Sequence, residues 1–89
     1  MKAVVTVTGK DKVGIIAITS AECAKHGANI LDISQTVMDE YFAMIMLVDI
    51  DNIRTDFGVF ADSMEAVGKE HGVDIRTMHE DIFITMHKL

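Results

Sequence analysis

Three stretches of the chain carry the apolar and β-branched residues that are typical of β-strands. They are residues 2–8 (KAVVTVT), 41–49 (YFAMIMLVD) and 73–78 (VDIRTM). Residues 41–49 are apolar on both sides of the predicted strand. Because a strand of this kind needs cover on both faces, we expect it to lie in the centre of a sheet.

A fourth predicted strand, residues 29–37 (NILDISQTV), alternates between two sides. The strict period of two places Leu31 and Ile33 on one side, and Ile30 with Asp32 on the wetter side. The short polar segment 38–40 follows it, which predicts an antiparallel hairpin with residues 41–49.

Two longer segments follow the helical period. Residues 13–26 carry Ile15, Ile16, Thr19 and Cys23 near one helical face, and residues 57–71 repeat apolar side chains at helical spacing. The tail, residues 79–89, fits a helical stripe but also an alternating strand, and we predict a short helix there.

The predicted order is β-α-β-β-α-β with a short tail. Right-handed crossovers place both helices on one face of a four-stranded antiparallel sheet, so we predict an α+β fold of the ferredoxin-like type. The segment KHGANI at 25–30 recurs as EHGVDI at 70–75, each time between a helix and a strand, so the two halves are related. With no proline and no low-complexity linker, we expect residues 1–89 to form one domain.

Charge and size restrict the partners of this domain. The net charge of −6 repels phosphate backbones and anionic lipid, so we expect neither nucleic acid nor membrane as a partner. A chain of 89 residues buries only about 60% of the surface that its unfolded form exposes. A modest core with open strand edges favours a homodimer.

The single cysteine, Cys23, cannot form an internal disulfide, and the chain starts directly on a predicted strand without a signal-peptide pattern. We therefore expect a cytoplasmic protein. Cys23 lies on the apolar face of its helix, where a thiol is usually an inert packing residue.

The loop GKDKVGII at 9–16 is the strongest candidate for chemistry, and it fails one specific test. A phosphate-binding P-loop needs lysine and then serine or threonine directly after its second glycine, but Ile15 and Ile16 follow Gly14. Lys10 and Lys12 lie inside the loop instead. We therefore exclude a nucleotide-hydrolysing site.

Other functions of proteins with this topology need residues that this chain lacks. Base stacking needs aromatic side chains along the central strands, and a metal chaperone needs a C-x-x-C loop. His79 and His87 are about 12 Å apart along a helix, too far for one metal ion. No catalytic triad, carboxylate pair or cofactor fingerprint occurs, so we expect no enzymatic activity, no cofactor and no metal.

Two short motifs in this framework resemble the start of an ACT domain. They are the loop Asp11-Lys12-Val13-Gly14 and the turn Gly27-Ala28-Asn29-Ile30, although Val13 stands where many ACT domains have proline. The resemblance covers residues 2–79. With its short tail, the chain looks most like small stand-alone ACT proteins akin to the regulatory domains of the glycine cleavage repressor.

The resemblance implies a regulatory domain that pairs with a second copy and binds an amino-acid-like effector near the first loop, with a regulated protein as a further partner. It implies ligand contacts from six residues: Asp11, Lys12, Val13, Gly14, Ile15 and Asn29. Backbone amides at a helix start suit a carboxylate, and the side chains of Asp11 and Asn29 suit an ammonium group.

Two interpretations of the loop stay open at this point, and effector binding is the first. In the second, Asp11 is the N-cap of the first helix and Asn29 is a turn residue, which leaves the loop without a ligand. The domain would then be a protein-interaction module that regulates a partner by contact.

Overall fold

Four strands form one antiparallel sheet in the computed structural model, which describes residues 1–10 and 13–86. The strands are β1 (Lys2–Gly9), β2 (Asn29–Met38), β3 (Tyr41–Asp49) and β4 (Asp74–His79). Their order in space is β2-β3-β1-β4, and each neighbouring pair is antiparallel. The prediction that residues 41–49 form a central strand is confirmed.

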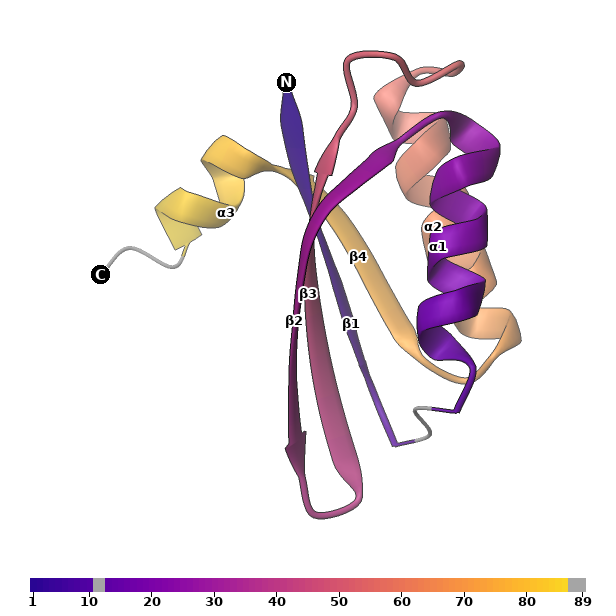
Figure 1. Ribbon diagram of the computed structural model, residues 1–89, viewed down its shortest axis with the longest axis vertical. Coiled ribbons are helices and arrows are strands. Elements are labelled where there is room, and N and C mark those ends of the chain that lie inside the picture. The colour runs from indigo at the N-terminus through magenta and orange to yellow at the C-terminus, as the bar shows by residue number, and fades with distance from the viewer. Residues whose placement is uncertain (11–12, 87–89) are drawn as a thin grey trace.

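The helices divide between the two faces of the sheet (Figure 1). Helices α1 (Ile15–His26) and α2 (Phe57–Glu70) cover one face, and α3 (Glu80–Met86) lies on the other side. The ferredoxin-like plan and the helical tail, as far as residue 86, are therefore confirmed. No helix in the described part of the chain is long and apolar enough to cross a membrane.

The core lies between the sheet and the two longer helices. Phe60 and Met64 of α2 pack there with Met44 and Met46 of β3, and none of these four side chains has more than 1% of its surface exposed. Burying one side chain of this size contributes about 1.5–3 kcal/mol. This contact between α2 and the central strand is therefore a main source of stability.

His26 is part of this core, although it ends a helix. Its ring meets the ring of Phe60 edge to face at 5.5 Å between centroids, and its Nε2 lies 3.0 Å from a carboxylate oxygen of Glu22. The contact joins the end of α1 to α2, so His26 has a packing role.

The faces of β2 differ from the strict alternation predicted by the sequence. Ile30 pairs with Val48 and Asp32 with Leu47, so Leu31 is an extra residue in a β-bulge. A bulge reverses the alternation beyond it. Ile30 therefore packs against the core together with Ile33, and its predicted place beside Asp32 is wrong.

The start of α1 also differs from the prediction. The helix begins at Ile15 and not at residue 13, and Ile16 is 42% exposed, although the pattern placed it on the buried face. Neighbouring helical residues point about 100° apart, so Ile15 and Ile16 cannot both point at the sheet. Ile15, Thr19 and Cys23 form the buried stripe.

We call the sheet face opposite α1 and α2 the open face, because α3 covers only part of it. Tyr41, Ala43 and Ile45 of β3 lie on this face, and Tyr41 and Ile45 are 52% and 42% exposed. A two-residue turn joins β2 to this strand, with Asp39 in the left-handed conformation at φ 56°. The open face therefore offers apolar side chains to solvent at the hairpin end of the sheet.

Candidate functional site

Gly9, the last residue of β1, lies close to Val73, which directly precedes β4. A Cβ atom on Gly9 would lie 2.7 Å from Cγ1 of Val73 and 3.5 Å from the ring of Phe42. Glycine at this position therefore lets β1 reach the loop without displacing the core.

Gly14 forms the turn from the loop into α1. It is the N-cap of the helix and has φ 76°, a left-handed conformation that strains any residue with a side chain. The interpretation of Asp11 as the N-cap is therefore wrong, because the cap position belongs to Gly14. Residues 11 and 12 themselves lie outside the described residues.

The backbone at this turn supplies hydrogen-bond donors. The first helical bond runs from the amide of Ile18 to the carbonyl of Gly14, at 3.0 Å. The amides of Ile15, Ile16 and Ala17 precede it, and such amides carry the partial positive charge of a helix start. A carboxylate is the natural ligand for this kind of position.

The predicted site side chains around the turn differ in exposure. Val13 is 83% exposed, whereas Ile15 is 4% exposed and packs in the core. Ile15 can therefore offer a ligand only its backbone. Val13 and Ile16 are both exposed apolar side chains close to the turn in sequence.

Asn29 lies at the opposite end of the sheet from the loop. It pairs with Asp49 of β3, whereas Gly9 pairs with Phe42 of the same strand. These two partners are seven residues apart, about 23 Å along a strand. Within one subunit, no small molecule can touch both Asn29 and the first loop.

A tight turn holds Asn29 in place. Gly27 has φ 80°, and the amides of Gly27 and Ala28 donate to the carbonyls of Ala24 and Cys23, at 3.1 and 2.9 Å. This is the pattern that closes a helix with a left-handed glycine. The turn residue is thus Gly27, and Asn29 is the first residue of β2.

The described residues show no arrangement for covalent or metal chemistry. Burial raises the pKa of the Cys23 thiol to about 11, with a smaller effect of Glu22, so the thiolate is disfavoured. No three His, Cys, Asp or Glu side chains between residues 1–10 and 13–86 come together as a metal site. His87 lies outside these ranges.

The structure also shows a pocket that the sequence did not predict. It has a volume of about 750 Å³ and lies at the hairpin end of the sheet, beside the first loop. Its lining comes from β1, β2, β3, Lys10 of the first loop and the turn after α2, and these segments share no motif. The available signal was the apolar outer side of residues 41–49.

Known proteins resemble the chain over almost its whole length. A UPF0237 protein of Methanocaldococcus jannaschii is 51% identical, and the match covers 99% of this chain and 98% of that protein. An ACT domain protein from Streptococcus pneumoniae has a solved structure with 46% identity and a TM-score of 0.81, covering 93% of each chain.

A more distant structure has the same fold. It is assigned to a glycine cleavage system transcriptional repressor, with 20% identity and a TM-score of 0.72 over 85% of this chain and 43% of that one. The sequence pattern of the ACT domain matches residues 2–78. Together with the near-complete likeness to its relatives, this match shows that the chain belongs to the ACT domain family.

Proposed function

We propose that this chain is a regulatory module that binds an amino-acid-like effector at the first loop and has no catalytic activity of its own. The observation that carries the proposal is the turn at Gly14, an N-cap without a side chain, which places the start of α1 beside the exposed side chains of Val13 and Ile16. The amides from Val13 to Ile15 face the effector carboxylate, and Asp11 and Asn29 contact its ammonium group.

The distance between the loop and Asn29 requires two subunits. Strand β2 is an edge of the sheet. A second subunit related by a two-fold axis and paired antiparallel along β2 would bring Asn29 of that subunit beside Met38 of the first. Met38 at that end lies near the first loop, because its partner Tyr41 is next to the partner of Gly9. Each site would thus combine the loop of one subunit with Asn29 of the other.

Exposed apolar side chains support pairing at this edge. Leu31 and Val37 of β2 are 44% and 52% exposed, and Ile16 of the adjacent α1 is 42% exposed. An edge strand also leaves backbone groups without ladder partners. We therefore propose a homodimer. We also propose a cytoplasmic location, because the single cysteine of the chain is buried and free, which suits the reducing cytosol.

A thermal-shift screen of the common amino acids tests the function. We expect at least one stabiliser, because a ligand that binds only the native state adds about 2.7 kcal/mol at a hundredfold excess over its dissociation constant. Asp11→Ala and Asn29→Ala should weaken the shift. The matched controls Asp62→Ala and Lys69→Ala, on the exposed side of α2, should keep it.

Mixing the two loop-site variants tests the shared site. In re-equilibrated dimers of Asp11→Ala with Asn29→Ala, half of the dimers are mixed, and each mixed dimer has one intact site. Isothermal calorimetry should then recover binding at about a quarter of the sites. If no site is recovered, the effector is not held between subunits, and if no amino acid stabilises the protein, a module acting by protein contact replaces this proposal.

A further inference from the structure

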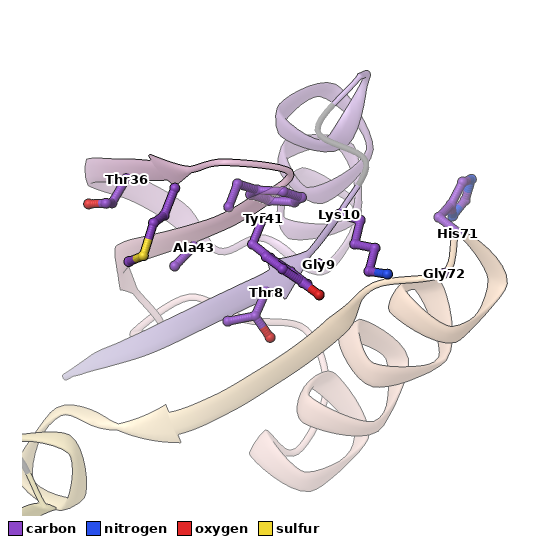
Figure 2. A pocket seen from close by; sticks show the side chains of 10 residues that line it. Thr8, Gly9, Lys10, Thr36, Tyr41, Ala43, His71 and Gly72 are labelled. Atoms are coloured by element: carbon purple, nitrogen blue, oxygen red, sulfur yellow. The ribbon is translucent and has the colours of Figure 1, made fainter.

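The pocket at the hairpin end of the open face is distinct from the loop site and has a chemistry of its own (Figure 2). Thr8 of β1, Thr36 of β2, and Tyr41 and Ala43 of β3 form its floor, and Met38 of β2 also lines it. Lys10, His71 and Gly72 lie at its other side. A volume of about 750 Å³ is within the range of small-molecule sites.

Most polar groups of this pocket lie toward one end. In Figure 2 the hydroxyls of Thr8 and Tyr41 and the ammonium of Lys10 lie on one side, and Ala43 lies on the other, where Thr36 carries a single hydroxyl. A pocket divided in this way fits a molecule with one polar end and one apolar body.

The polar end favours an anion. Its lining contains no aspartate or glutamate, although the whole chain carries 14 acidic and 8 basic residues. The Lys10 ammonium lies 5.4 Å from the centroid of the Tyr41 ring. Among residues 1–10 and 13–86, no carboxylate pairs with this ammonium, and the Tyr41 ring holds it beside the pocket.

We propose that this pocket binds a small carboxylic acid with an apolar body. The carboxylate accepts hydrogen bonds from the Lys10 ammonium and from the hydroxyls of Tyr41 and Thr8, and the body packs on Ala43 and Met38. One cation with neutral donors suits a single negative charge. A phosphate dianion would bring a second charge into the field of a chain with net charge −6.

This site does not depend on the proposed effector site. The loop site uses the start of α1, Asp11 and the Asn29 end of a second copy, whereas the pocket uses the open face of one subunit together with Lys10, which precedes Asp11 in the same loop. The two sites can therefore be tested separately, with different variants.

The probe is phenylacetate, which carries one carboxylate on an aromatic body, and its neutral counterpart is phenylacetamide. In a titration followed by nitrogen-15 NMR, phenylacetate should shift the amides of Thr8, Lys10, Tyr41 and Ala43, with a dissociation constant of about a millimolar. Phenylacetamide should bind about tenfold more weakly, because it lacks the charge.

Two substitutions should weaken binding of phenylacetate for different reasons. Lys10→Gln removes the cation and should cost about fivefold, since the ammonium is solvated. Ala43→Leu fills the apolar end and should cost about tenfold or more. Lys69→Gln and Ala66→Leu make the same changes on the exposed side of α2 and should leave binding unchanged.

The outcomes separate the alternatives. Absence of amide shifts at 10 times the expected dissociation constant, about 10 mM, overturns the proposal. Shifts that centre on residues 13–18 and survive Ala43→Leu also overturn it, because the probe then occupies the loop site. Equal affinity for phenylacetate and phenylacetamide contradicts the role of Lys10. If the probe does not bind and Ala43→Leu changes the oligomeric state, the open face is instead a contact surface for a second copy of the chain, and the proposal is overturned.

Discussion

Replacing Gly27 by alanine perturbs the end of α1 in two ways at once. The residue has φ 80°, and an added Cβ would lie 2.8 Å from the backbone oxygen of Asn52. Gly72 occupies the related position in the second half of the chain, at φ 73°, but a Cβ there meets nothing within 4 Å. The two glycines therefore share the strain, and only Gly27 has the clash.

The expected loss follows from these two contributions. Left-handed backbone costs about 1–2 kcal/mol for alanine at either position. Relieving the contact with Asn52 moves a loop whose Arg54 amide donates to the His26 carbonyl at 3.0 Å, and whose Arg54 guanidinium donates to the Lys25 carbonyl at 2.8 Å. Weakening these bonds adds about 1–1.5 kcal/mol.

Urea unfolding followed by circular dichroism, at one fixed protein concentration, measures the difference. With a slope of about 1.5 kcal/mol/M, Gly27→Ala should lower the midpoint by about 1.3–2.3 M and Gly72→Ala by about 0.7–1.3 M. Asparagine tolerates the left-handed conformation, so Gly72→Asn should be nearly neutral. Gly27→Asn should still lose about 1 kcal/mol from the clash.

Equal losses for Gly27→Ala and Gly72→Ala would refute this reasoning. They would mean that the loop at Asn52 moves aside without cost and that only backbone strain matters. A neutral Gly27→Asn would have the same meaning. A larger loss at Gly72 would show that the turn before β4 is more constrained than its open surroundings indicate.

Three further predictions concern the core. Cys23 should resist thiol reagents under native conditions. Burial keeps the pKa of its thiol at about 11 in the folded state, against 9.0 in the unfolded chain, so the folded state binds more protons between these two values. The unfolding free energy should therefore fall between about pH 9 and 11 more in wild type than in Cys23→Ala. Thr77→Val should raise the unfolding free energy by about 1 kcal/mol in urea titration, because the buried Thr77 hydroxyl has no partner among the described residues; a loss would reveal a bond that the hydroxyl makes. Phe60→Leu should cost about 2 kcal/mol through a cavity and the lost edge contact with His26, and Phe57→Leu, at the rim of the core, should cost less; calorimetry showing the reverse order would contradict the packing.

Several features of the chain could be predicted from local pattern alone. The apolar outer and inner sides of β3 indicated a central strand, and the order of elements indicated the ferredoxin-like plan. The related segments 25–30 and 70–75 were predicted to lie between a helix and a strand, and in both of them the glycine, Gly27 or Gly72, has left-handed backbone. These features follow from the period of side chains and from backbone sterics, which act between residues close in sequence.

Other features depend on which segments meet, and only the tertiary structure decided them. The bulge at Leu31 moves Ile30 to the core, because pairing with β3 skips one residue. The family resemblance assigns Asn29 and the first loop to one effector site, but within a subunit they lie at opposite ends of the sheet. The reason is that α1, which connects them, has 12 residues and spans about 18 Å. The pocket joins Lys10, Tyr41 and His71 through pairing and crossover, and such long-range contacts leave no periodic signal in any one segment.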